Sequence, residues 1–239
     1  MTLTKSTLEH PHWGKIVITR NPRARRIIMR ARPDAIYMTV PLHAKGNDIE
    51  RALDECGARL KEAQESNSTE HIGQDFTIDT PHFKLSIQEN NNPGIRITGR
   101  DGRYTLYCPT GTDYTTERTQ KVLRQCIKGA MKHCAGVMLP PRLEALAKKH
   151  GFRYSRCTVR DVQSRWGSCT SHGSINLNIR LSMLPDRLID YVLLHELCHT
   201  VEMNHSERFW ALVEQHVPDW RKKREKLSQV QVWLDAYFK

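Results

Sequence analysis

The chain has 239 residues, of which 38% are hydrophobic, and it carries a formal net charge of +11. This length allows one large domain or two small ones with a buried core. No run of 18 apolar residues occurs and residues 1–12 lack a leader pattern, so we expect a cytoplasmic protein, neither secreted nor membrane-spanning. Seven cysteines without CxxC spacing favour free thiols over a disulfide framework.

The first half of the chain predicts a small β-rich module with one helix over residues 12–115. Alternating apolar and polar residues indicate short strands, with turns expected at 21–22 and 33–34. A helix is expected from Asn47 to about residue 64. The predicted strands cover residues 15–20, 25–31, 36–40, 76–78, 83–87, 95–98 and 104–107.

From residue 116 the apolar spacing lengthens to that of helices, which predicts a second module over 116–239. The first helix of this module is expected to be interrupted at Leu139-Pro140-Pro141, with a kink there, and a second piece from Pro141 is expected to end before Gly151. Strands are predicted at 156–162 and 174–179, and further helices at 186–203, 206–216 and 219–237. No internal repeat is evident. The separation of strands and helices along the chain predicts an α+β fold.

One short segment near the C-terminus carries chemistry, because residues 195–199 form an HExxH sequence. On a helix, side chains at i and i+4 lie on the same side, so His195 and His199 can bind one zinc ion, Zn²⁺. Glu196 then stands beside the metal as general base. The segment therefore predicts zinc-assisted hydrolysis of an amide. The alternative is a half-exposed helix whose histidines only cap and pack, and Cys198 is interpreted as a packing residue.

The third metal ligand is expected to be His205, which has the spacing of the metzincin pattern HExxHxxGxxH. Glu202 stands at the glycine position of that pattern, and Asn204 is expected to supply the turn. No methionine follows Met203, so no metzincin Met-turn is available. Glu202 is the rival ligand, but on the same helix face it would lie about a turn too far along. We interpret Glu202 as a supporting carboxylate.

Several further segments resemble the YgjP-like metallopeptidases. They are residues 23–27, 164–169 (SRWGSC), 175–181, 190–192, the HELCH pentad and 203–210. That family is similar to SprT-type and other zincin proteases. The resemblance implies a zincin-like metallopeptidase domain that acts on a peptide or protein. It also implies zinc binding by His195, His199 and His205, with Glu196 as catalytic base.

Residues before the HExxH segment are candidates for substrate contacts. The strand at 174–179 is the expected shelf for an extended peptide, because an edge strand binds peptides through main-chain hydrogen bonds. The alternative is an ordinary core strand, since its isoleucines and leucine alternate with asparagines. Trp166 is interpreted as a packing anchor. Arg165 either orients a carboxylate or forms a structural salt bridge, and no oxyanion-binding residue can be singled out.

Positive charge is concentrated in the second half of the chain. Residues 1–119 hold 17 Lys and Arg against 15 Asp and Glu, whereas residues 120–239 hold 20 against 11. A basic surface of this kind attracts phosphates. No base-reading module is evident, so nucleic-acid binding is not favoured. The alternative function is a basic nucleic-acid adaptor with a structural zinc site, which has no need of Glu196.

Overall fold

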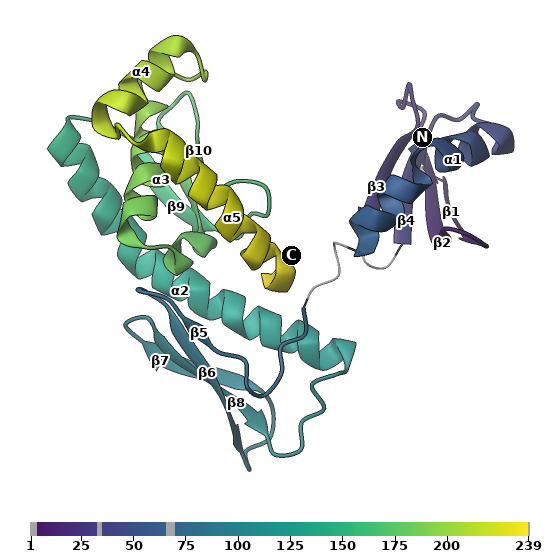
Figure 1. The fold of residues 1–239 in the computed structure, drawn as a ribbon, viewed down its shortest axis with the longest axis horizontal. Helices are drawn as coiled ribbons and strands as arrows, with labels where there is room; N and C mark the ends of the chain where they lie inside the picture. The colour runs from purple at the N-terminus through teal and green to yellow at the C-terminus, as the bar shows by residue number, and fades with distance from the viewer. Residues whose placement is uncertain (1–3, 33–34, 66–69, 239) are drawn as a thin grey trace. The chain divides into compact units, whose positions relative to one another are not determined.

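The computed structural model describes residues 4–32, 35–65 and 70–238, so the turn expected at 33–34 lies outside the described residues. Strand-rich and helical regions follow one another, which confirms the predicted α+β class. The chain divides into two compact units, residues 1–70 and 71–239 (Figure 1). This boundary differs from the one expected at 115/116, because the second sheet shares its core with the long helix that follows it.

The first unit is a four-stranded sheet with one helix. The sheet has the order β1-β2-β4-β3, with β2 and β4 parallel and the outer pairs antiparallel. Its elements are β1 (Thr4–His10), β2 (Gly14–Arg20), β3 (Ile28–Arg32), β4 (Ala35–Val40) and α1 (Gly46–Glu65). Ile16, Ile36 and Met38 of the sheet and Leu53 of α1 form its core. β1 was not predicted, because Leu8 is its only large apolar residue.

The second unit begins with a sheet of the same topology. Its strands are β5 (Ile78–Asp79), β6 (Lys84–Asn90), β7 (Arg96–Arg100) and β8 (Arg103–Pro109). Their order is β5-β6-β8-β7, again with a parallel central pair and antiparallel outer pairs. Each sheet is followed by a helix. The arrangement of four strands and a helix therefore occurs twice, although no sequence repeat predicted it.

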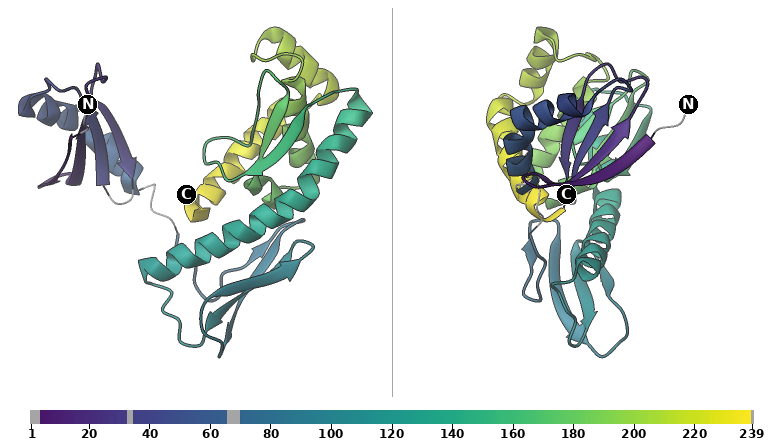
Figure 2. Two further views of the ribbon diagram at one scale, coloured as in Figure 1. Left: turned by 180° about the vertical axis from the view of Figure 1, so that it is seen from behind. Right: turned by 90° about the vertical axis from the view of Figure 1, so that its right-hand side faces the viewer.

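The helix after this sheet, α2 (Glu117–His150), is continuous, so the interruption expected at residues 139–141 does not occur. Thr116 caps its first turn by accepting a hydrogen bond from the Thr119 N–H, and Gly151 ends it with a φ of 75°. The helix bends part-way along its length (Figure 2). Pro140 removes an N–H donor, but Leu139 and Leu143 are both fully buried in one core, and this packing holds the helix together across the prolines.

The remaining elements form the part of the second unit that contains the HExxH segment. They are β9 (Arg156–Arg160), β10 (Gly167–Cys169), β11 (Ser174–Asn178), a 3₁₀ helix η1 (Ile179–Met183), α3 (Asp186–Cys198), α4 (Glu207–His216) and α5 (Trp220–Phe238). The sheet order is β10-β11-β9. β11 is the central strand, so its expected role as substrate shelf is wrong. The edge strand next to α3 is β10.

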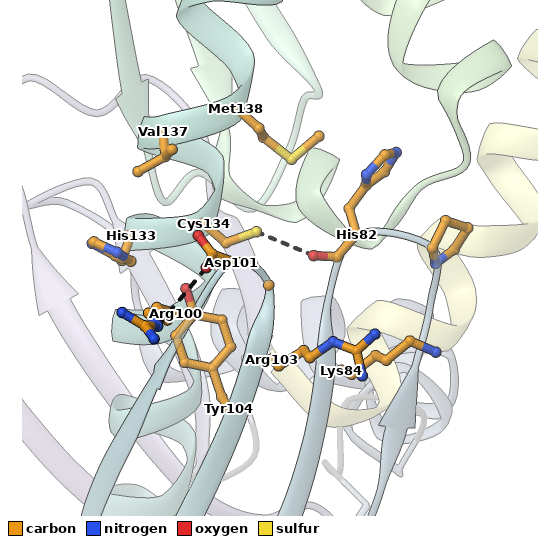
Figure 3. Close-up of a pocket in the computed structure, with 12 residues that line it drawn as sticks. His82, Lys84, Arg100, Asp101, Arg103, Tyr104, His133, Cys134, Val137 and Met138 are labelled. Carbon is orange, nitrogen blue, oxygen red and sulfur yellow. Dashed lines mark hydrogen bonds and ion pairs between the residues drawn. The ribbon is translucent and has the colours of Figure 1, made fainter.

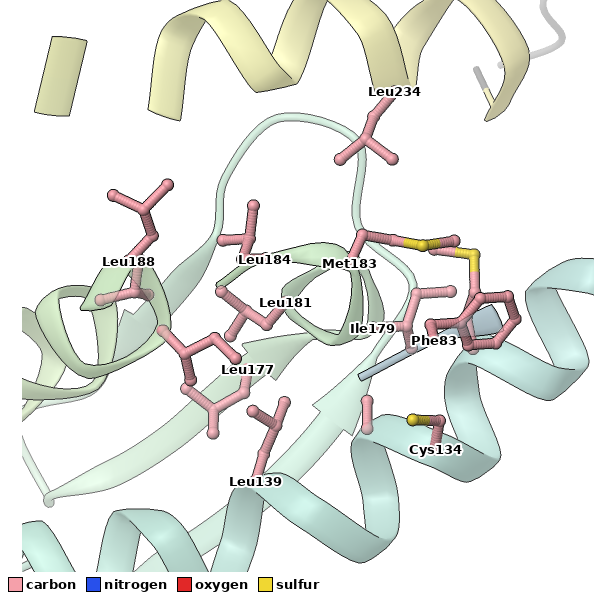
Figure 4. Packing of buried hydrophobic residues seen from close by; sticks show 14 of the residues in the cluster. Phe83, Cys134, Leu139, Leu177, Ile179, Leu181, Met183, Leu184, Leu188 and Leu234 are labelled. Carbon is pink, nitrogen blue, oxygen red and sulfur yellow. The ribbon is translucent and has the colours of Figure 1, made fainter. Parts of the chain in front are cut away.

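The core of this unit lies around η1. Ile179, Leu181 and Met183 pack against α2 on one side and against Leu234 of α5 on the other (Figure 4). Arg180, also in η1, is 1% exposed and donates hydrogen bonds to the Asp235 carboxylate at 2.7 Å and to the Phe238 carbonyl at 2.8 Å. Both partners belong to α5. Apolar packing and a buried ion pair therefore anchor the C-terminal helix to the core.

The predicted free thiols are confirmed, since all seven cysteines are unpaired. Cys198, in the HExxH segment, is fully buried, as expected of a packing residue. Within the described ranges, no helix is long and apolar enough to cross a membrane.

Candidate metal centre

The HExxH segment lies at the end of α3, which stops at Cys198 and not near residue 203 as predicted. Tight turns follow, with the Thr200 N–H bonded to the Leu197 carbonyl at 2.9 Å and the Val201 N–H bonded to the Cys198 carbonyl at 3.0 Å. Val201 is therefore exposed and does not extend the apolar face of the helix. Asn204 has no positive φ, so the left-handed turn expected there does not occur.

These turns bring the three predicted histidines together. The side-chain nitrogens of His195, His199 and His205 that face one another all lie within 4.8 Å. The Nε2 atoms of His195 and His205 are 3.2 Å apart. Glu202 is not part of this cluster. Its main-chain carbonyl instead lies 3.1 Å from Nδ1 of His199, where it orients that ring and leaves Nε2 directed at the cluster.

Aromatic side chains of α4 hold the histidine rings. Phe209 stacks on His199 with ring centroids 4.2 Å apart, and its edge meets His195. Trp210 lies against His205 with ring centroids 5.4 Å apart. Ser206 starts α4 by accepting a hydrogen bond from the Phe209 N–H. This cap therefore also positions the Phe209 and Trp210 side chains.

Burial sets the protonation of the site. It lowers the pKa of His195 to about 3, assisted by the charges of His199, His205 and Arg224. Burial also lowers the pKa of His199. Neutral imidazoles are the form that binds metals. Burial also disfavours a charged carboxylate, and it raises the pKa of Glu196 to about 8. The charge of Arg165 opposes this increase.

A polar atom next to the histidines, Oε2 of Glu196, is buried without a hydrogen-bond partner among the described residues. Burying such atoms unpaired is costly, and sites that do so are commonly completed by an ion, water or ligand. Three histidine nitrogens are a donor set suited to a transition metal. The residues present therefore fit a bound metal ion.

Glu196 is held in place by a glycine on the edge strand. Gly167 of β10 faces Glu196 so closely that a methyl group on its Cα would lie 2.6 Å from Oε1 and 2.8 Å from the carboxyl carbon. A side chain at this position would displace the Glu196 carboxylate. β10 and α3 thus meet at a close contact that a glycine leaves undisturbed, and Glu196 is 4% exposed.

The histidines open into a cleft of about 1140 Å³. One side is formed by residues 163–169, which include β10, and the other by α5. A separate cavity of about 310 Å³ lies between the β5–β8 sheet and α2, lined by His82, Tyr104 and Cys134 (Figure 3). None of the three clustered histidines lines this smaller cavity. The chemistry of the HExxH segment therefore belongs to the larger cleft.

The model of the YgjP-like metallopeptidase domain matches residues 25–230 of the chain. The chain belongs to the YgjP-like metallopeptidase family. It is accordingly a hydrolase, as the sequence predicted. The chain is also similar to the crystal structure of the metallopeptidase zymogen of Pyrococcus abyssi abylysin, at 24% identity and a TM-score of 0.36, over 43% of this chain and 100% of that one. Among the curated proteins, none matches.

Sequence reasoning missed several residues of this YgjP-like site. Phe209 and Trp210 lie in a segment that carries the family resemblance, but their spacing predicted no role for them. Gly167 also lies in such a segment, and its contact with Glu196 forms only when the sheet has folded. Arg224 of α5 lines the cleft, but the sequence predicted only a helix at 219–237 and no role for its residues. A helical wheel of α5 could have indicated that Arg224 lies on the same side of the helix as Leu227.

Proposed function

We propose that this YgjP-like protein is a zinc-dependent peptidase in which His195, His199 and His205 bind the metal. The observation that carries the proposal is the convergence of the three histidines beside a buried carboxylate. Two ligands about 2.0–2.1 Å from a tetrahedral zinc lie about 3.3 Å apart. The 3.2 Å between Nε2 of His195 and Nε2 of His205 agrees with this spacing.

Glu196 acts as the proton carrier. Zinc bound by the histidines would polarise the scissile carbonyl and make the attacking water more acidic. Glu196 then takes a proton from that water and passes it to the leaving amine. Burial raises the pKa of the Glu196 carboxyl in the absence of a metal, and the positive charge of bound zinc would lower it again. The two opposed effects suit a group that both accepts and releases a proton. The unpartnered Oε2 is free to receive the proton.

The substrate lies along β10. Trp166 O accepts a hydrogen bond from Asn178 N at 2.9 Å, and Thr170 N donates one to Ser174 O at 3.0 Å. In an antiparallel pair the bonded residues alternate, so the N–H and C=O groups of Gly167 and Cys169 point to the open edge. An extended peptide can add to this edge as a further strand, next to Glu196.

Substituting Gly167 with Ala is expected to lower peptidase activity by about 10- to 100-fold while zinc stays bound. The added methyl group would meet the Glu196 carboxylate at 2.6 Å and displace it, and a shift of about 1 Å at a catalytic group costs up to about 10²-fold in rate. Gly136→Ala in α2 is the matched control, since a methyl group there meets nothing within 4 Å. Zinc content and kcat/KM of both variants check this prediction; a fully active Gly167→Ala protein would contradict it.

The proposed function is tested with an unfolded protein as substrate. We expect new peptide termini, detected by mass spectrometry, that disappear when a chelator removes the metal and return when zinc is added. Cleavage that continues in the metal-free protein would refute the zinc mechanism. Zinc binding without any cleavage would instead favour a structural metal site.

A further inference from the structure

The charges that line the histidine cleft are unbalanced. Besides the buried Glu196, the one carboxylate of the lining is Asp235. Asp235 is already bonded to the buried Arg180 at 2.7 Å and to Gln231 at 2.9 Å. The cations of the lining are Arg165 and Arg224, and neither forms an ion pair with a carboxylate within the described part of the chain. The cleft therefore presents positive charge to a substrate.

Arg224, an exposed residue of α5, lies against a group of stacked rings. Its guanidinium lies 5.5 Å from the centroid of the Trp210 ring. Trp210 stacks on Trp220 with ring centroids 4.1 Å apart and planes within 17°. Trp210 also stacks on the metal-site residue His205, with ring centroids 5.4 Å apart. A cation–π contact attracts a guanidinium to a ring without neutralising its charge. Trp210 contacts both Arg224 and His205, so Arg224 lies near the histidine cluster with its donors available.

We propose that the cleft selects peptides with a carboxylate close to the scissile bond and that Arg224 binds this carboxylate. The proposal rests on the peptidase function proposed above and names its substrate class. A guanidinium binds a carboxylate through two parallel hydrogen bonds, which gives geometric selection in addition to attraction. The carboxylate belongs either to an acidic side chain or to the C-terminus of the substrate. Both sources present the same group to Arg224.

Arg165 is assigned a different role. Its charge acts on Glu196 and opposes the effect of burial on that carboxyl. A substitution of Arg165 would therefore change the proton carrier as well as the substrate site. The charge of Arg224 acts on the metal ligand His195, so the zinc content of each Arg224 variant is measured as well. The preference is a ratio of rates for two peptides on one variant, and an effect on the metal site changes both rates alike.

The test uses peptides that differ only in one residue beside the cleavage position, Glu, Gln or Lys, each with a free or an amidated C-terminus. Wild-type protein is expected to cleave the Glu peptide with a kcat/KM about tenfold above that of the Gln peptide, with the Lys peptide lowest. The difference should lie in KM and shrink at high salt. Arg224→Gln should reduce the preference to about twofold or less, and Arg224→Lys should retain part of it.

Arg221→Gln is the matched control. Arg221 belongs to the same helix and stacks over Trp220 at 4.5 Å, but it pairs with Glu214 and does not line the cleft. Its substitution should leave the preference for Glu unchanged. A preference that survives amidation identifies an acidic side chain as the source, and one that amidation abolishes identifies the substrate C-terminus.

Equal cleavage of the Glu, Gln and Lys peptides would overturn this proposal and leave the peptidase function intact. A loss of the preference in Arg221→Gln equal to that in Arg224→Gln would overturn the role of Arg224. If no peptide is cleaved, the peptidase function fails, and the affinity of the Glu196→Gln protein for the Glu and Gln peptides still decides the charge selection. Equal affinities would then refute it.

Discussion

Glu196→Gln is expected to retain its zinc and to lose peptide hydrolysis by on the order of 10²-fold or more. The amide has nearly the same size and hydrogen-bonding shape as the carboxyl group but cannot take a proton from the attacking water. The proposed metal ligands are the three clustered histidines, and this substitution leaves them unchanged. The rate of hydrolysis and the zinc content are measured on the same preparation, together with the circular dichroism spectrum.

Peptide binding along β10 should persist in this variant, because the edge of the strand is unaltered. The inactive protein can therefore be used to capture its natural substrate. A Glu196→Gln protein that cleaves as fast as the parent would exclude Glu196 as the proton carrier and favour a structural metal site.

His205→Ala is expected to lower zinc affinity by at least two orders of magnitude and to abolish hydrolysis with it. Removing one of three ligands leaves two histidines from one helix, which cannot complete a tetrahedral site. His205 is exposed and lies outside α3 and α4, so the fold should tolerate the substitution. Zinc content after dialysis against a weak chelator measures the effect.

Glu202→Ala is the matched control for His205→Ala. The Glu202 side chain is outside the histidine cluster, and its contact with His199 uses the main-chain carbonyl, which alanine preserves. This variant should keep its zinc. The opposite pattern, with an empty Glu202→Ala site and a full His205→Ala site, would show that the ligand assignment is wrong.

The HExxH helix and the clustering of its histidines with His205 could be anticipated from sequence, because both follow from local spacing. The i and i+4 positions of His195 and His199 share one helix face whatever surrounds them. The way in which His205 reaches the cluster could not be anticipated. The expected left-handed turn at Asn204 is replaced by an early helix end at Cys198, and the competing hydrogen bonds of residues 200–202 determine where α3 stops.

Features that depend on distant contacts were missed or mistaken. β10 has only three residues, too few for an alternating pattern, so the edge role was assigned to β11, whose pattern is longer. The prolines at 140 and 141 predicted an interruption of α2, but buried neighbours on both sides outweigh the local cost of about 3 kcal/mol. The contact of Gly167 with Glu196 joins residues of different elements and has no local signal.

The most direct test of the proposed zinc peptidase is the rate of peptide hydrolysis as zinc is returned stepwise to the metal-free protein. We expect the rate to rise from zero and to reach its plateau at about one zinc per chain, because one cluster of three histidines forms the site. Full hydrolysis in the metal-free protein, or one tightly bound zinc without hydrolysis of any peptide, would contradict the account.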